Sequence, residues 1–187
     1  QPLRYIGIDF SVAALHAAQD ATSDALKHVD RLFSGRISGP TPVSQQWVRG
    51  RSVETLPFAD HSFDRIVVNL SLSFSRSPLH ALRELFRVLR PGGKLIVSVI
   101  TPLADMALPY RSSLQELGVD AFSGDARLAL NRMAQCCVAL RVGQLHAFQE
   151  ESLSAALAQV TSTPTRLVRT FSGQILVALA EKPDSAG

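Results

Sequence analysis

Apolar residues recur along the chain with two different periods, and their order predicts an alternation of strands and helices. A short apolar run, residues 3–8, stops at Asp9 and predicts a buried strand. An Ala-rich stretch of helical periodicity begins at Val12, and Ser11 stands where its side chain can cap that helix. The chain is therefore expected to open with a strand, an acidic turn and a helix.

The apolar pattern is densest over residues 63–70, which contain the aliphatic run Ile66–Val68. A continuous run of this kind is typical of a parallel strand covered on both faces. A weaker pattern predicts another strand over residues 45–49, after a loop rich in Gly, Pro and Ser at residues 35–44.

A helix and a further strand are predicted in the middle of the chain. Ser77 and Pro78 supply a cap and a first-turn proline, and leucines at helical spacing follow them. The turn Pro91–Gly93 predicts the end of this helix and a direct swing into a strand over residues 94–100. Such an order of strand, helix and strand favours a parallel sheet with right-handed crossovers.

Beyond residue 101 the pattern predicts three more helices and two strands, at residues 112–117, 126–140, 151–160, 165–171 and 174–181. The short turn Ser172-Gly173 between the two strands indicates an antiparallel hairpin. We therefore expect one α/β domain over residues 1–182, with a mostly parallel sheet and an antiparallel last strand. Residues 183–187 are expected to form a tail.

The composition excludes several classes of protein. Of the 187 residues, 46% are hydrophobic, which is enough apolar material for one folded core, and the net charge is only +3. The arginines form no run that would bind a nucleic-acid backbone, and the longest apolar run, residues 95–100, is too short to cross a bilayer. The adjacent Cys136 and Cys137 indicate a reducing, cytoplasmic location and no metal site.

Asp9 places a carboxylate at the carboxyl end of a predicted parallel strand, where open α/β sheets bind their ligands. There it can accept hydrogen bonds from both hydroxyls of a ribose. It can equally be a residue of the turn before the helix. Because several nucleotide-binding folds use this arrangement, Asp9 alone does not distinguish one cofactor from another.

The longest informative stretch of sequence lies between residues 54 and 100. It contains Glu54–Phe58, then Ser62–Asp64, then the segment Leu82–Leu95 with its Arg-Pro-Gly-Gly turn. This stretch resembles the type 11 group of class I methyltransferases. The resemblance implies a Rossmann-like three-layer sandwich whose last strand is antiparallel, S-adenosylmethionine as cofactor and S-adenosylhomocysteine as product.

The same resemblance implies residues that hold the cofactor. Asp9 would bind the ribose, Phe10 would lie against the adenine, and the backbone of Val53 would meet the adenine edge. Asn69 would line the methionine end of the pocket. Two structural alternatives stay open, since Phe10 can be a core aromatic residue and Asn69 a polar cap of its strand.

The sequence departs from the family pattern at Ser52 and at the neighbouring pair Ser73 and Phe74. Ser52 stands where the family usually has an Asp, so a weaker hydrogen-bond acceptor faces the cofactor amine. Ser73 and Phe74 stand where many members have two histidines, so no acid or base is expected at these positions.

A third departure is the absence of the glycine-rich loop that follows the first strand in the family. The chain starts at Gln1, at about the family's second strand. Without the first strand, the two strands that flank it would bury unpaired backbone groups, each at a cost of roughly 1–3 kcal/mol. We therefore expect the strand to come from an upstream part of the polypeptide, a second chain or homodimer partner, or a swapped element.

Substrate contacts are expected from an insertion over residues 102–146, which the resemblance implies to be a lid. Its polar candidates are Tyr110, Arg111 and His146, and for each a surface or capping role is the alternative. A sulfonium methyl donor is already reactive, so alignment of a small-molecule acceptor is the main task and a general base is optional.

Two other functions compete with methyl transfer. A non-catalytic methyltransferase-like module, acting as a pseudoenzyme or assembly partner, would explain Ser52 and the absent glycine loop. A nicotinamide-dependent dehydrogenase would share the acidic strand end at Asp9, but it fits poorly with the Pro91–Gly93 turn and the antiparallel finish.

Overall fold

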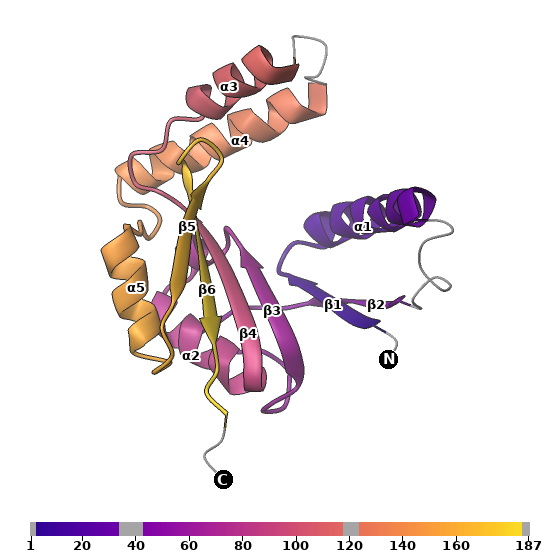
Figure 1. Cartoon of the computed structure of the whole chain (residues 1–187), viewed down its shortest axis with the longest axis vertical. Helices are drawn as coiled ribbons and strands as arrows, with labels where there is room; N and C mark the ends of the chain where they lie inside the picture. The colour runs from indigo at the N-terminus through magenta and orange to yellow at the C-terminus, as the bar shows by residue number, and fades with distance from the viewer. Residues whose placement is uncertain (1–2, 34–42, 118–123, 185–187) are drawn as a thin grey trace. The chain divides into compact units, whose positions relative to one another are not determined.

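The computed structural model describes residues 3–33, 43–117 and 124–184 (Figure 1). The chain divides into two compact units, Gln1–Ser52 and Val53–Gly187, and each is described by itself. Most of the loop expected at residues 35–44 and the end of the expected tail lie outside the described residues.

The first unit consists of two parallel strands joined by a helix. Strand β1 (Leu3–Asp9) pairs in parallel with β2 (Val43–Arg49) over its full length, and α1 (Val12–Phe33) connects them. The expected cap is confirmed, because the backbone N–H of Ala14 donates to the hydroxyl of Ser11 at 3.3 Å. The sequence therefore predicts the order and nature of these elements correctly.

The prediction that β1 is a buried strand is wrong. Only Gly7 of this strand is buried, whereas Leu3, Tyr5 and Ile8 are exposed. Among the described residues β1 pairs with β2 alone, so its other edge has no neighbouring strand. An isolated pair of strands buries too little apolar surface to be stable by itself.

A close contact between the two strands of this unit requires a glycine. The indole of Trp47 lies over Gly7, and a Cβ atom at Gly7 would come within 2.3 Å of a ring carbon. Trp47 also packs edge-on against Tyr5, with ring centroids 5.5 Å apart. The small residue therefore lets the largest aromatic side chain of the unit lie flat on β1.

The second unit contains a four-stranded sheet in the order β3-β4-β6-β5. Strand β3 (Phe63–Asn69) is parallel to β4 (Leu89–Ile100), whereas β6 (Ile175–Glu181) is antiparallel to both β4 and β5 (Arg166–Thr170). The predicted antiparallel hairpin and the antiparallel last strand are confirmed. Among the described residues, β3 has β4 as its one neighbouring strand.

Helices account for the rest of the second unit: η1 (Leu72–Phe74), α2 (Pro78–Val88), α3 (Ala107–Leu117), α4 (Gly124–Arg141) and α5 (Glu150–Ala158). Leucines of α2 and α5 bury one face of the sheet, together with alternate residues of β4 and β6. In Figure 1, α3 and α4 lie together beyond the end of the sheet at which β4 finishes.

The opposite face of this sheet is open at β3 and β4. Val67 is 67% exposed, and its cross-strand neighbour Ile96 is 38% exposed. The prediction that β3 is covered on both faces is therefore wrong for the described residues, because no described helix of this unit packs over Val67.

Helix α2 begins and ends differently from the sequence prediction. Ser77 occupies the cap position, but its side chain makes no capping bond, and its N–H donates instead to Glu54 Oε1 at 2.8 Å. The helix ends at Val88, before Pro91, because Leu89 already has extended backbone and starts β4.

The turn from α2 into β4 is held by Lys182, which follows β6. Its ammonium donates hydrogen bonds to the carbonyls of Phe86 and Leu89, and its backbone pairs with Gly92 and Gly93 at 2.9 Å. Burial lowers the pKa of this ammonium, while the carbonyls replace part of its hydration. A single residue thereby caps the helix and fixes the glycine turn.

A half-buried carboxylate ties the segment before β3 to α2. Glu84 Oε1 accepts the N–H of Leu56 at 2.8 Å, and both Glu84 oxygens accept from Arg87 at 2.7 Å. Arg87 also donates to the carbonyl of Phe58 and pairs with Asp60. The Arg87 hydrogen bonds lower the pKa of Glu84 most, against an opposing effect of burial. The family-like residues of this stretch are thus one connected network.

Replacing Gly7 by Ala is expected to destabilise the protein by about 1–3 kcal/mol, because the added methyl group forces the Trp47 ring off the strand. Thermal unfolding measures the effect. The double variant Gly7→Ala, Trp47→Leu should lose little more than Trp47→Leu alone, and strictly additive losses would contradict the proposed clash.

Replacing Glu84 by Gln is expected to lower the free energy of unfolding by about 2 kcal/mol at neutral pH, because Arg87 loses the less exposed of its two charged partners. The folded-state pKa of Glu84 lies below its ordinary value of 4.5, so the stabilisation is present above that pH and fades as the pH falls further. The difference between wild type and Glu84→Gln should therefore narrow in denaturant titrations below about pH 4.5. The exposed control Glu151→Gln should show no such narrowing.

Candidate cofactor and substrate site

Asp9 lies at the carboxyl end of β1, half-buried, and takes part in the turn into α1. Its Oδ1 accepts the N–H of Ser11 at 2.7 Å, and its carbonyl accepts the N–H of Gly50 at 3.0 Å. Within the described residues the other carboxylate oxygen has no hydrogen bond. Asp9 can therefore be a turn residue and a ribose ligand at once. One carboxylate oxygen bonds within the turn, and the second can accept a hydrogen bond from a ligand.

Phe10 projects from the same turn and is 70% exposed. Its carbonyl accepts from Arg49 Nε at 3.4 Å, which joins the carboxyl ends of β1 and β2. With so much of its ring exposed, Phe10 is not a core aromatic in the first unit. An exposed ring at a ligand-binding strand end is suited to stacking on a flat base.

Ser52 and Val53 follow the carboxyl end of β2, at the boundary of the two units. Both are half-buried. Val53 packs against the large apolar core of the second unit, so its side chain has a structural role. The expected adenine contact of Val53 uses its backbone and stays a prediction, as does the contact expected of Ser52.

Asn69 ends β3 and is held from the neighbouring strand. Its Oδ1 accepts the hydroxyl of Ser98 at 2.7 Å, and the same hydroxyl accepts the N–H of Leu70 at 3.0 Å. The bond occupies the amide oxygen, so the amide N–H groups are the part of the exposed side chain that can donate to a ligand. Asn69 therefore caps its strand, and its amide N–H groups can in addition donate to a carboxylate of a ligand.

The carboxyl ends of β3 and β4 lead into a second, smaller apolar cluster. Leu70 has a left-handed backbone conformation, with φ of 57°, and its side chain turns into this cluster. Ile100, Met106 and Cys137 form the buried centre of the cluster. It joins the ligand-binding edge of the sheet to α4.

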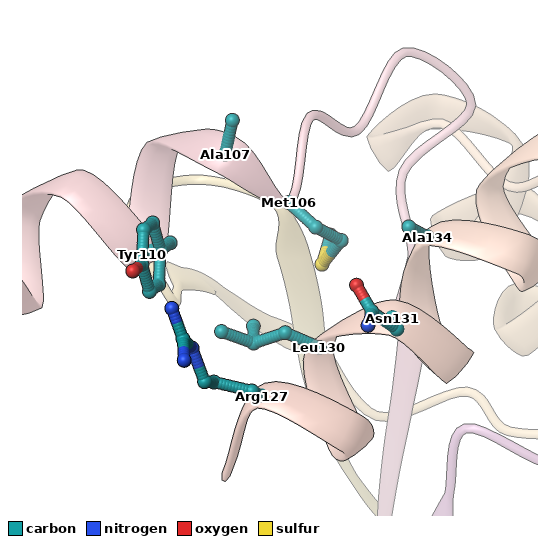
Figure 2. A pocket seen from close by; sticks show the side chains of 7 residues that line it. All are labelled: Met106, Ala107, Tyr110, Arg127, Leu130, Asn131 and Ala134. Carbon is teal, nitrogen blue, oxygen red and sulfur yellow. The ribbon is translucent and has the colours of Figure 1, made fainter. Parts of the chain in front are cut away.

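A hollow of about 600 Å³ lies between α3 and α4, and Met106 belongs both to its lining and to the small cluster that contains Ile100. Its lining residues are Met106, Ala107, Tyr110, Arg127, Leu130, Asn131 and Ala134. Figure 2 shows Tyr110 and Arg127 at one end, with Met106 and Asn131 reaching in from the other.

The structure separates the three predicted substrate residues. Tyr110 lines the hollow, but Arg111 points to Asp105, with 4.0 Å between Nη2 and Oδ2. The backbone N–H of His146 donates to Ser73 and its Nε2 lies 3.3 Å from the carbonyl of Arg76, so this residue fastens the α4–α5 connection to the segment after β3.

Arg127 and Asn131 line the hollow but were not predicted as site residues. The sequence does show that Arg127 and Asn131 share one helical face, since they are four positions apart. Leu130 and Ala134 lie on the same face. The alternation of apolar and polar residues on that face gave no sign that it borders a hollow rather than solvent.

No acid or base is found where the family pattern has histidines. The hydroxyls of Ser73 and nearby Ser75 are buried without a hydrogen-bond partner in the described part of the chain, and Phe74 is 52% exposed. Over those same residues, no group of three His, Cys, Asp or Glu side chains could bind a metal ion. No helix in the described ranges is long and apolar enough to cross a membrane.

Comparison with protein families identifies the class of this protein. The family described as "Methyltransferase domain" matches residues 1–97, which include β1, β2, β3, α2 and most of β4. The chain therefore belongs to the methyltransferase-domain family. This confirms the resemblance found in the sequence.

Curated relatives match shorter stretches. The chain is 38% identical over 80 residues to the ubiquinone/menaquinone biosynthesis C-methyltransferase UbiE of Roseobacter denitrificans, covering 43% of this chain and 32% of that protein. It is 51% identical over 49 residues to the malonyl-[acyl-carrier protein] O-methyltransferase of Erwinia pyrifoliae, covering 26% of this chain and 19% of that protein. The chain thus spans less than a third of the length of these relatives.

Solved structures support the fold. An S-adenosylmethionine-dependent methyltransferase of Thermotoga maritima superposes with a TM-score of 0.55 at 15% identity, covering 97% of this chain and 82% of that one. A methyltransferase of Methanosarcina mazei gives 0.52 at 19% identity, covering 97% and 83%. The predicted Rossmann-like α/β fold class is confirmed.

Proposed function

We propose that this protein transfers a methyl group from S-adenosylmethionine to a small molecule. The family match over residues 1–97 carries the proposal, because it includes both strand ends at which Asp9 and Asn69 lie. The relatives match only part of this chain, so their names do not identify its methyl acceptor.

The residues present fit the cofactor that the family uses. The second carboxylate oxygen of Asp9 can accept from ribose hydroxyls, and the exposed ring of Phe10 can stack on adenine. The amide N–H groups of Asn69 can donate to the carboxylate of the methionine part, since its oxygen is already bonded to Ser98. When bound, S-adenosylmethionine supplies a reactive sulfonium methyl group.

The protein's own contribution to the reaction would be alignment. Holding two reacting groups in line can remove several kcal/mol from a barrier, on the order of 7–11 in favourable cases. Neither Ser73 nor Phe74 can act as a general base, and a nucleophilic acceptor would not need one at these positions. We also place the protein in the cytoplasm, as the free thiols Cys136 and Cys137 suggest.

A non-catalytic module is the second candidate function. Ser52 in place of a carboxylate favours it, as does the free edge of β1 beside the turn at Asp9. A protein of this kind would keep the fold and the strand-end turn without holding the cofactor.

We further propose that an added strand and its helix complete the protein, supplied by the same polypeptide or by a second chain. The free edges of β1 and β3, the exposed Tyr5 and Ile8, and the open face around Val67 support this. Apolar surface of that kind is normally covered in a working protein.

Replacing Asp9 by Asn is expected to weaken S-adenosylmethionine binding at least tenfold, because the ribose loses a charged acceptor worth about 1.5–3 kcal/mol. Isothermal titration calorimetry on the protein measures it. The control Asp20→Asn, on the exposed side of α1, should bind as wild type does. If wild-type protein gives no heat at millimolar cofactor, methyl transfer is ruled out and the non-catalytic function is left.

Replacing Val67 by Asp is expected to lower the free energy of unfolding by about 3 kcal/mol in the complete protein, because the covering element would bury an unpaired charge. The control Leu103→Asp changes a side chain that is 85% exposed and should cost little. Chemical denaturation compares the two. Equal small losses would mean that solvent, and no added element, covers the face at Val67. If Val67→Asp does cost more than the control, the molar mass from light scattering shows whether the covering element belongs to the same chain or to a second one.

A further inference from the structure

The hollow between α3 and α4 combines an apolar body with polar groups at both ends. Met106 is buried and Leu130 half-buried, and two alanines widen the space between the helices. Tyr110, Arg127 and Asn131 supply a hydroxyl, a guanidinium and an amide (Figure 2). Such a lining suits a molecule with an apolar body and a hydrogen-bond acceptor at its end.

Arg127 is the cation of this lining, and no carboxylate is among the lining residues. Two other arginines of α3 and α4 are already engaged, since Arg111 pairs with Asp105 and Arg141 donates to the carbonyl of Ala104 at 2.7 Å. Arg127 has no hydrogen bond or ion pair with a described residue. Among the described residues, nothing competes with an anion in the hollow for this guanidinium.

The position of the hollow connects it to the proposed reaction. Met106 packs in the same small cluster as Leu70 and Ile100, the residues at the carboxyl ends of β3 and β4. Ligands of open α/β sheets bind at this edge. A molecule seated on Met106 is thus close to the strand end that carries Asn69.

We propose that this hollow binds an elongated carboxylic acid, whose apolar body lies on Met106 and Leu130 and whose carboxylate pairs with Arg127. The planar guanidinium matches a carboxylate in a two-point pair. A single cation suits a singly charged group better than a phosphate, which usually draws several cations. Resting on the proposed function, the inference makes the methyl acceptor an apolar organic acid.

A matched pair of probes tests the inference: 4-phenylbutyrate and its uncharged amide, 4-phenylbutanamide. Titration calorimetry on the protein should give about fivefold tighter binding of the acid, the size expected of an ion pair at a partly exposed site. Neither measurement needs the cofactor. The chain has two methionines, so methyl-labelled protein gives two signals in NMR spectra. The signal of Met106, which lines the hollow, should shift with the acid more than that of Met133, which does not line it.

Substitutions on α4 provide the control. Arg127→Gln should remove the preference for the acid over the amide, whereas Arg132→Gln changes an exposed arginine of the same helix outside the hollow and should keep it. Circular dichroism confirms that both variants are folded. If both variants lose the preference for the acid equally, the preference reflects the overall charge of the protein and the inference is wrong. It is also wrong if wild type binds the acid and the amide equally, or binds neither.

Failure of this inference and failure of the proposed function are distinguishable. Cofactor titration of the same preparations reports on S-adenosylmethionine alone. If that cofactor binds and the acid does not, methyl transfer stands and the acceptor belongs to another chemical class. If the acid binds as described and the cofactor does not, the hollow is a ligand site of a protein without methyl transfer.

Discussion

The half-buried Glu84 carboxylate organises the approach to the sheet of the second unit. It accepts from the backbone of Leu56 and from Arg87, and Arg87 in turn holds the carbonyl of Phe58, so a loop of irregular backbone is fixed on α2. That loop leads from Val53 into β3, the strand that ends at Asn69. The loop is also held by backbone bonds from His61 and Ser62 to the end of α2, so this ion pair is the central one of several contacts that fix its path into β3. Replacing either charged partner would therefore disturb the position of β3 as well as local stability.

Much of the fold could be predicted from the sequence, because local signals specify it. Proline and glycine mark the turn into β4, aliphatic runs mark the strands, and the short turn at Ser172-Gly173 marks an antiparallel hairpin. Burial was predicted less well. The sequence of β3 has the apolar residues of a strand covered on both faces, yet Val67 is exposed, because coverage depends on elements elsewhere that a strand's own residues do not specify.

The candidate site was predicted in part for a similar reason. Asp9 and Asn69 stand next to recognisable strand ends, so their location follows from the strand pattern. Of the predicted substrate residues, Tyr110 lines the hollow and Arg111 and His146 do not, since ion pairs and backbone contacts decide where long polar side chains point. Arg127 lies on a helix with a mixed surface, where only the packing of α3 against α4 distinguishes a hollow from open solvent.

Lys182 makes the order of folding depend on a distant part of the chain. Its ammonium reaches carbonyls at the end of α2 across more than ninety residues of sequence. During synthesis, α2 and the glycine turn emerge long before β6 has been made, so their exposed carbonyls remain solvated until the antiparallel strand docks. Long-range closure of this kind slows folding and leaves a half-finished sheet exposed for longer, which increases the need for protection by chaperones in the interval.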